Sequence, residues 1–324
     1  MRKRLFDIIV CPACKAELSE AGDRLSCPKC AKSYEVRSGV PVMLPEAMVR
    51  DSDTIATKRM FSFAWKRFAR DEASKSWFKD SFTYMSYVPQ GLFSAAAGKI
   101  GLDVGCGSGV DMISMNRKGF EMVGIDISDA AYEASANTRD IEKVHVVQAS
   151  VYDMPLKDNF FDLGYSFGVL HHLPRPEEGF KRLCDKVKRG GSVIIYVYED
   201  FAERSALERA LLKAVNSLRV VTKRLPPPVL YSLCVLASPF VLLSCSLPYQ
   251  IFKRIPATRK FAERIPFRHT VRLDCIVADL YDRFSPPIER RYNRQEVEAW
   301  FRKAGFEDIN VINHRGWVAW GRKR

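Results

Sequence analysis

The sequence predicts an α/β protein with a mostly parallel central sheet, a small cysteine-rich domain before it and a helical insertion near its end. Residues 100–126 read as strand, glycine-rich turn, helix and second strand. Further short apolar runs at 143–147, 160–166 and 192–198 are separated by polar or helix-like segments, the pattern typical of a parallel sheet. Four cysteines within the first thirty residues predict a separate N-terminal unit.

The first strand–turn–helix–strand unit predicts a site for a nucleotide-like cofactor. Residues 100–104 are apolar and of strand length, and we expect a helix over 110–118 and a strand over 121–125. The free N–H groups of the helix then lie at the turn. Asp126 follows the second strand, where a carboxylate accepts hydrogen bonds from ribose hydroxyls. The turn itself contains three glycines: Gly105, Gly107 and Gly109.

The rest of the sheet is predicted from shorter patterns. Asn293 and Glu296 have the spacing of a capping box, which predicts that a helix begins at Arg294. The other expected elements are helix 176–186, strand 192–198, helix 294–303 and a closing pair of strands at 306–312 and 317–321.

The turn resembles motif I of the class I S-adenosylmethionine (SAM) methyltransferases. Asp103 lies two residues before the first glycine, and Val110 stands where a dinucleotide-binding GxGxxG fingerprint requires glycine. A carboxylate suits a cofactor that carries an ammonium and a sulfonium, and suits a pyrophosphate badly. The resemblance implies SAM as cofactor and a Rossmann-like, mostly parallel seven-stranded sheet.

Residues 143–173 resemble the ubiquinone/menaquinone-type methyltransferases in more detail. Where that family commonly has an acid that contacts adenine, this chain has Ser150, and Asp153 is an alternative three residues later. By resemblance, the GVLHHL segment lies near the acceptor. The expected cofactor-binding residues are Asp103, Gly105, Cys106, Gly107, Gly109, Asp126, Ile127, Ser150, Val151 and Phe167.

The N-terminal cysteines predict a structural zinc site. They form two CxxC pairs, CPAC and CPKC, separated by twelve residues, which is the ligand spacing of a zinc ribbon. Nothing like a signal peptide precedes them, so we expect a reducing, cytoplasmic setting that disfavours disulfides. The domain resembles the small zinc-ribbon activators of tRNA and protein methyltransferases. The expected ligands are Cys11, Cys14, Cys27 and Cys30.

Positive charge is concentrated late in the chain. The net charge is +13, and residues 200–324 contain 23 basic and 12 acidic side chains. This distribution favours an anionic partner such as RNA, phospholipid headgroups or a phosphorylated substrate, although a solvated basic surface has the same composition.

Residues 225–252 carry no charged side chain and are flanked by basic pairs. The prolines in this segment predict that it is not one uninterrupted helix. A helical lid over the active site and a segment in the membrane interface both remain open. We reject a membrane span, because it would separate the last strands from their own sheet.

The acceptor side is predicted less sharply. His171 is the candidate general base, because an imidazole titrates near neutral pH; a histidine that merely closes the strand end is the alternative. The leader around Phe61 and Trp65 either closes over the cofactor, as the resemblance implies, or packs on the sheet as an amphipathic helix. By resemblance, the substrate-side candidates are Tyr281, Asp282, Arg283, Arg290 and Tyr292.

We therefore expect a SAM-dependent methyltransferase with a fused zinc ribbon, acting on a small or lipid-linked acceptor at the cytoplasmic face of the membrane. An rRNA or tRNA methyltransferase is the alternative, and a non-enzymatic docking or activating protein is the second. The predicted domains are a zinc ribbon at 1–50, a helical leader at 51–98, a SAM-binding core at 99–199, a helical insertion at 200–284 and a closing segment at 285–324.

Overall fold

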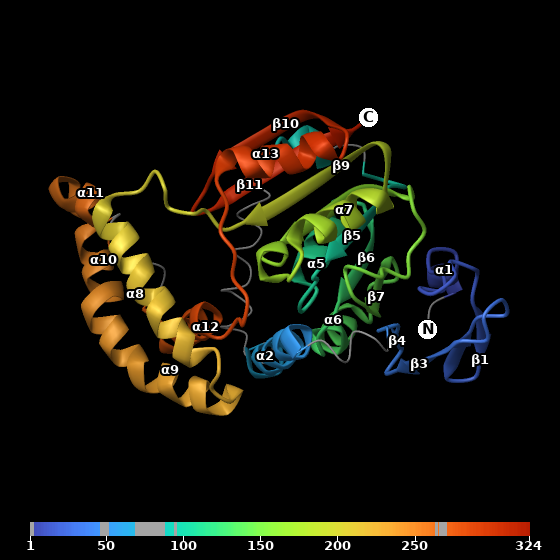
Figure 1. Cartoon of the computed structure of the whole chain (residues 1–324), viewed down its shortest axis with the longest axis horizontal. Helices are drawn as coiled ribbons and strands as arrows, with labels where there is room; N and C mark the ends of the chain where they lie inside the picture. Colours follow the sequence, from blue (N-terminus) through green and yellow to red (C-terminus); the bar gives the residue numbers. More distant parts are fainter. Residues whose placement is uncertain (1–2, 46–51, 69–87, 94–95, 263–264, 266–270) are drawn as a thin grey trace.

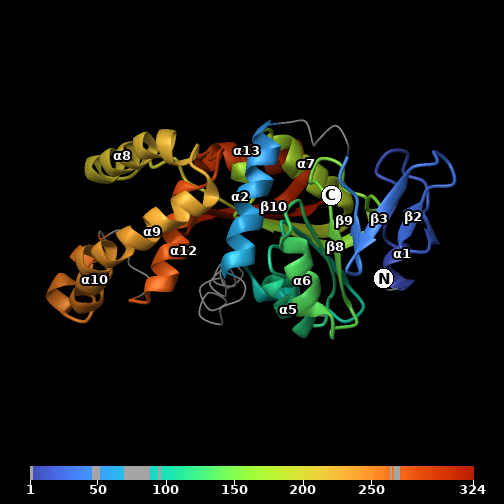
Figure 2. The ribbon, with the colours of Figure 1, turned by 90° about the horizontal axis from the view of Figure 1, so that it is seen from below.

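The computed structural model describes residues 3–45, 52–68, 88–93, 96–262, 265 and 271–324. Within them, helices flank both faces of one long sheet (Figure 1). A zinc-ribbon-like domain lies at one end of the sheet and a group of helices at the other, as Figure 2 also shows. The fold is thus the predicted α/β arrangement.

Seven strands form the core of the sheet, in the order β7-β6-β5-β8-β9-β11-β10. All neighbouring pairs from β7 to β9 are parallel, whereas β11 is antiparallel to both β9 and β10. This is the class I methyltransferase topology, with the last strand inserted beside the fifth. The strands are β5 (Ile100–Val104), β6 (Glu121–Asp126), β7 (Val144–Gln148), β8 (Phe161–Phe167), β9 (Val187–Val197), β10 (Phe306–Asn313) and β11 (Trp317–Lys323).

Local sequence determines most of the element ends. The predicted capping box is present, with the Asn293 side chain accepting from the Glu296 N–H at 2.9 Å. One strand differs from the prediction. Strand β9 begins at Val187 rather than at residue 192, and its pairing with β8 shifts register after Phe161. The helices of the core are α5 (Val110–Arg117), α6 (Ala130–Thr138), α7 (Pro176–Lys186) and α13 (Arg294–Lys303).

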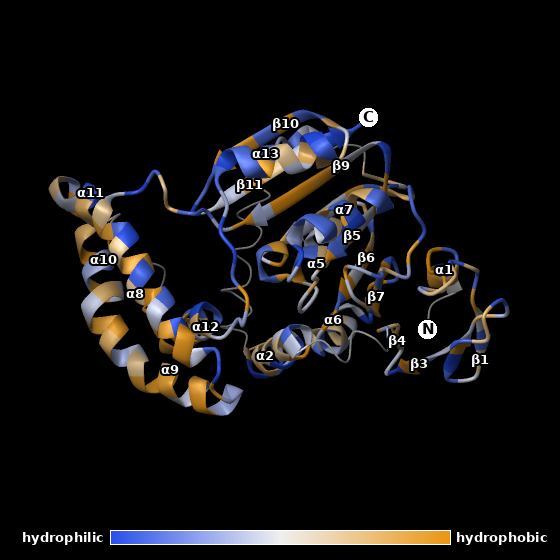
Figure 3. Cartoon of the chain, viewed as in Figure 1, coloured by the Kyte–Doolittle hydropathy of each residue, from blue (hydrophilic) through white to orange (hydrophobic). Residues whose placement is uncertain are grey.

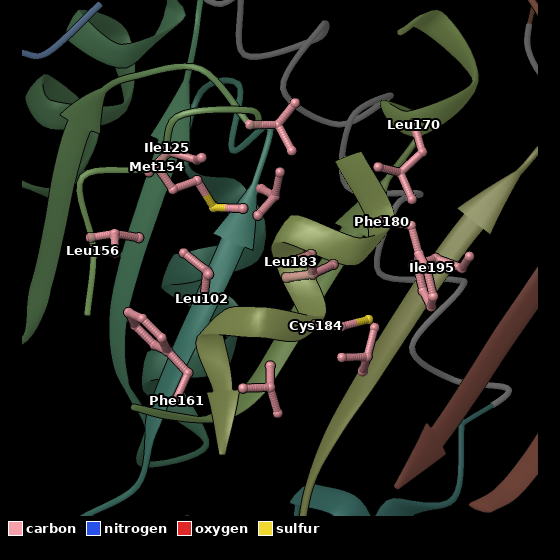
Figure 4. Packing of buried hydrophobic residues seen from close by; sticks show 14 of the residues in the cluster. Leu102, Ile125, Met154, Leu156, Phe161, Leu170, Phe180, Leu183, Cys184 and Ile195 are labelled. Atoms are coloured by element: carbon pink, nitrogen blue, oxygen red, sulfur yellow. The ribbon is translucent and has the colours of Figure 1, made fainter. Parts of the chain in front are cut away.

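One face of the sheet is covered by α7 and α13. Phe180, Leu183 and Cys184 of α7 pack on Leu102 of β5 and Ile195 of β9, as Figure 4 shows. All of these side chains are 3% exposed or less, so the parallel strands are buried as the apolar runs predicted.

The N-terminal domain extends the same sheet. Its strands are β1 (Ser19–Ala21), β2 (Arg24–Ser26), β3 (Ser33–Arg37) and β4 (Val40–Val42), and they follow α1 (Lys3–Phe6). Strand β4 pairs in parallel with β7, and the Met43 N–H donates to the Gln148 carbonyl at 2.8 Å. Ile8 and Ile9 are fully buried in the core that also contains Leu102. The ribbon therefore shares a hydrophobic core with the α/β domain.

The helical insertion begins after β9. We call residues 206–262 the helical arm; it contains α8 (Ala206–Thr222), α9 (Pro227–Val241), a π-helical turn (Leu242–Ser246), α10 (Leu247–Phe252) and α11 (Arg259–Ala262). It projects from the sheet at the end opposite the ribbon (Figures 1 and 2). Helix α9 packs against α12 (Leu273–Phe284) and α2 (Ser52–Phe68).

The expectation that prolines interrupt residues 225–252 was wrong. Helical structure is continuous over Pro227–Phe252. Pro239 cannot donate to the carbonyl of Val235, but the Ser238 hydroxyl donates to that carbonyl at 2.8 Å. A neighbouring side chain thus satisfies the backbone acceptor that the proline leaves unpaired.

Candidate functional site

The glycine turn after β5 requires glycine for steric reasons. Gly105 and Gly107 have φ values of +83° and +50°, in the left-handed region. A Cβ on Gly105 would lie 2.2 Å from Val169, and one on Gly107 would lie 2.4 Å from the indole of Trp65. The backbone of the turn therefore packs directly against Val169, which follows β8, and against Trp65 of α2.

Asp126 lies at the carboxyl end of β6, as predicted. Its carboxylate accepts from the Gly107 N–H at 3.0 Å, from the Ser128 N–H at 2.8 Å and from the Ser128 hydroxyl at 2.6 Å. These donors hold the side chain against the glycine turn, at the edge of the sheet where the strands end.

Two further carboxylates lie beside the turn without a cationic partner. Asp103 Oδ2 and Asp111 Oδ1 are buried and accept no hydrogen bond within the described part of the chain. Burial raises the pKa of Asp103 well above its usual range, and burial raises the pKa of Asp111 to about 7. A bound cation would offset the cost of burying these negative charges. The two carboxylates therefore fit the ammonium of an amino-acid cofactor. Asp111 was not predicted, although it stands directly after the glycine turn.

A cavity of about 260 Å³ lies over this turn. Nine predicted residues line it, whereas Asp103 and Gly109 do not. Ser150 is among them, but its hydroxyl accepts from the Tyr152 N–H at 3.1 Å, and Asp153 lies outside the lining. The nine are Gly105, Cys106, Gly107, Asp126, Ile127, Ser150, Val151, Phe167 and Asp282.

The two histidines of GVLHHL differ in position. His172 lines the cavity and its ring lies 5.6 Å from that of Phe61. His171, the predicted base, is fully buried, stacks on Tyr198 at 3.9 Å and is absent from the lining. Burial lowers the pKa of His171 well below its usual range. The structure therefore points to His172 as the histidine that a ligand can meet.

Four of the five substrate-side candidates lie away from the cavity lining. The Tyr281 hydroxyl contacts Met60 Sδ, and Arg283 donates to Asp279 at 2.8 Å. Arg290 donates to the Pro174 carbonyl at 3.0 Å, and the Tyr292 ring packs on Trp300 at 4.7 Å. Of the five, Asp282 alone lines the cavity, and burial raises its pKa to about 7.

Helix α2 lies along the other side of the cavity, and it packs mainly on α6, α12 and α9 rather than on the sheet, as the second expectation for the leader had it. Phe61 and Trp65 line the cavity, while Phe63 and Phe68 pack on Tyr281. The sequence pattern that indicated this helix is the run of aromatic residues Phe61, Phe63, Trp65 and Phe68. Thr54 and Thr57 of the same helix also line the cavity and were missed.

The apolar segment is not a lid over the cavity. None of residues 225–252 lines it; they pack behind α2 and α12, which do. Residues 69–87, which include the second half of the predicted leader segment, lie outside the described residues.

The four N-terminal cysteines converge as predicted. Their sulfurs all lie within 4.8 Å of one another, with Cys11 and Cys30 at 3.6 Å and Cys14 and Cys27 at 3.4 Å. Tetrahedral zinc with Zn–S bonds of about 2.3 Å places its sulfurs about 3.8 Å apart, so the set fits zinc. Four thiolates leave no position for water, which makes such a site structural.

Comparison with known proteins agrees with this geometry. Residues 102–195 match the methyltransferase domain family, and residues 2–39 match the Trm112p-like protein family. The chain thus contains a region that matches a methyltransferase domain, behind a region that matches a Trm112p-like protein. The methyltransferase domain contains the glycine turn, the three acids and both histidines.

Individual relatives are more distant. An uncharacterized protein of Synechococcus sp. is 26% identical over 227 residues, which are 67% of this chain and 49% of that protein. A tRNA U34 carboxymethyltransferase of Psychromonas ingrahamii is 36% identical over 99 residues, 29% of this chain and 30% of that enzyme. The chain thus spans half or less of the length of these relatives. Among solved structures, magnesium protoporphyrin IX methyltransferase of Synechocystis is similar at 13% identity and a TM-score of 0.49, over 84% of this chain and all of that one.

Proposed function

We propose that this chain is a SAM-dependent methyltransferase. The observation that carries the proposal is that Asp103 and Asp111, beside the glycine turn and Asp126, each have one buried oxygen that accepts no hydrogen bond in the described part of the chain. Asp111, which lines the cavity, would meet the ammonium end of SAM, with Asp103 next to it outside the lining, and Asp126 would bind the ribose hydroxyls. When bound, SAM supplies an activated methyl group on its sulfonium.

The residues of the chain then have three tasks: to orient the acceptor, to exclude water and, for some acceptors, to remove a proton. Phe61, Trp65 and Tyr198 line the cavity with flat apolar surfaces that exclude water. His172 lies among them and is neutral at pH 7, because burial lowers its pKa to about 4. The neutral ring can accept a proton, and its lowered pKa makes it a weak base.

Calorimetry with SAM tests the cofactor assignment. Asp126→Ala removes a charged hydrogen-bond acceptor and should weaken binding roughly tenfold or more. Asp140→Ala is the matched control, because that carboxylate is 89% exposed and lies outside the cavity lining. SAM affinity that is absent in the wild type, or unchanged in Asp126→Ala, would favour the non-enzymatic alternative.

The comparisons favour a nucleoside in tRNA as acceptor over the small or lipid-linked acceptor expected first. One relative named above acts on tRNA by its name, and the N-terminal domain is Trm112p-like. The aromatic lining of the cavity also suits a base, since every base stacks on aromatic faces. We therefore propose tRNA as the first acceptor to test.

A small or lipid-linked acceptor is the second candidate, because the exposed apolar arm packs on α2 and α12, which both line the cavity. Radiolabelled SAM incubated separately with total tRNA, a lipid extract and a small-metabolite extract distinguishes the two. Label in tRNA that disappears in His172→Ala or Asp126→Ala supports the first candidate. Label confined to the lipid or metabolite fraction overturns it.

A further inference from the structure

The exposed apolar side chains of this protein are concentrated in one region. Of the large apolar residues exposed in the described part of the chain, Ile55 alone lies outside residues 207–273. Soluble surfaces usually scatter such residues singly, so a concentration of this kind marks an interaction surface. Figure 3, coloured by hydropathy, shows orange turns alternating with paler ones along α9 and α10.

Helix α9 is apolar on both of its faces. The face that packs on α12 and α2 carries Leu230, Cys234 and Val241. The opposite face carries large apolar side chains: Leu236 is 76% exposed and Phe240 is 73% exposed. In a water-exposed helix the outer face is polar, so this face is made for an apolar environment.

Helix α8 has the same feature. Leu207, Leu211, Leu218 and Val221 recur at intervals of three, four and seven residues, which places them on one face, and all four are exposed. The polar side of the helix includes Arg219, which is buried and paired with Glu289. The protein thus anchors α8 by its polar side and leaves its apolar side free.

The charge of the arm indicates what covers these faces. Residues 206–262 contain nine basic side chains and a single acidic one, Glu208. All the basic residues except Arg219 are exposed. They flank the uncharged segment at both ends: Arg209, Lys213, Lys223, Arg224, Lys253, Arg254, Arg259 and Lys260.

We propose that the helical arm docks on the surface of an anionic phospholipid membrane. Apolar side chains with basic residues at their margins are the composition of an interfacial helix, whose apolar face enters the acyl boundary while lysine and arginine meet the headgroups. A nucleic acid would match the charge but would leave the apolar faces in water.

The arm lies in the membrane plane and does not cross the bilayer. Pro227–Phe252 is long and apolar enough for a span, and only 28% of its most apolar stretch is buried, so it is the contacts of its buried side that speak against a span. That buried side packs on α12 and α2 from Leu230 as far as Cys245. Because the same helices line the cavity through Asp282 and Trp65, a spanning α9 would draw the active site into the bilayer.

This surface is independent of the proposed methyl transfer, yet it places the cavity near the membrane. Helix α12 contacts the arm through Ile276, Val277 and Leu280 and lines the cavity through Asp282. Docking would hold the acceptor end of the cavity one helix away from the lipid surface.

Vesicle flotation of the full chain tests the proposal. The wild type should float with vesicles of equal parts phosphatidylcholine and phosphatidylglycerol, and high salt should reduce the bound fraction. Leu236→Glu with Phe240→Glu should lower the bound fraction about tenfold or more, because both side chains would have to carry charge into the acyl boundary. Ile55→Glu, at 45% exposure outside the arm, is the matched control and should float like the wild type.

Circular dichroism and SAM calorimetry on the same variants show whether the fold is intact. A wild type that floats but does not bind SAM would overturn the proposed function and leave this proposal standing. Absence of flotation would overturn the membrane proposal, as would equal binding to pure phosphatidylcholine and to the anionic mixture. A dimer in solution that ignores vesicles and dissociates in the double variant would show that a second copy covers the face.

Discussion

The Nδ1–H of His172 donates to the backbone carbonyl of Ile288 at 2.8 Å. A carbonyl only accepts, so this contact assigns the proton of the neutral ring to Nδ1 and leaves the lone pair on Nε2. His172 lines the cavity, and Nε2 is the ring nitrogen that is left to act as a hydrogen-bond acceptor. The segment before α13 thus orients the candidate base.

Replacing each histidine by alanine in turn distinguishes a catalytic role from a packing role. For an acceptor that must lose a proton, His172→Ala should lower kcat about 100-fold or more while SAM affinity changes little, because it removes the base alone. Single-turnover methyl transfer and calorimetry measure the two effects. An unchanged kcat would exclude His172 as a base.

His171→Ala should instead reduce stability. It removes a fully buried ring that stacks on Tyr198 at 3.9 Å, and such large-to-small changes cost about 2–5 kcal/mol. Urea unfolding measures the loss. If His171→Ala stayed as stable as the wild type but lost kcat, the original prediction for His171 would be correct.

Asp111→Asn should change the pH dependence of stability. In the folded protein burial raises the pKa of Asp111 from 3.8 to about 7, so the folded state holds this proton more tightly than the unfolded state. The stability that this group contributes is complete below about pH 4 and is lost as pH rises through about 7. At about 1.4 kcal/mol per pH unit, the loss approaches 4 kcal/mol at pH 8.

Without SAM, the asparagine variant should therefore be more stable than the wild type at pH 8 and similar at pH 4, as measured by urea unfolding. It should also bind SAM about tenfold more weakly, because a neutral amide no longer neutralises the ammonium. Equal stability curves at both pH values would show that Asp111 is not strained by burial.

Gly107→Ala should damage the cofactor site through sterics alone. The added methyl group would lie 2.4 Å from the Trp65 indole, on a residue with φ of +50°. A second change, Trp65→Leu, removes the clash but not the backbone strain. Calorimetry should therefore show SAM binding lost in Gly107→Ala and partly restored in the double variant; no restoration would mean that Trp65 does not press on the turn.

Protein purified without added metal should contain about one equivalent of zinc by elemental analysis. Cys27→Ser should increase hydrogen exchange over residues 8–43, because it removes one of the four thiolates that hold the ribbon. SAM affinity should change little, since no ribbon residue lines the cavity. Metal-free wild type, or exchange unchanged in the variant, would contradict a structural zinc site.

The sequence by itself determined the elements of the core and the identity of the turn. Strand Ile100–Val104 and helices Pro176–Lys186 and Arg294–Lys303 begin and end where apolar period, proline and capping box predicted. The convergence of the four cysteines and the position of the glycine turn were also predicted from the sequence. These features depend on neighbours within a few residues, so a local pattern is enough to predict them.

Tertiary structure alone decided which side chains meet in the site and which faces stay uncovered. His171 and His172 are adjacent in a 3₁₀ turn, and only the packing of Tyr198 and the carbonyl of Ile288 turns the second toward the cavity. Helix α2 reaches the glycine turn from forty residues earlier in the chain. The sequence also could not predict which face of α9 is buried, because an uncharged helix has no polar side that would indicate its exposed face. Such contacts join segments that are distant in sequence, and their geometry follows from how the whole core packs.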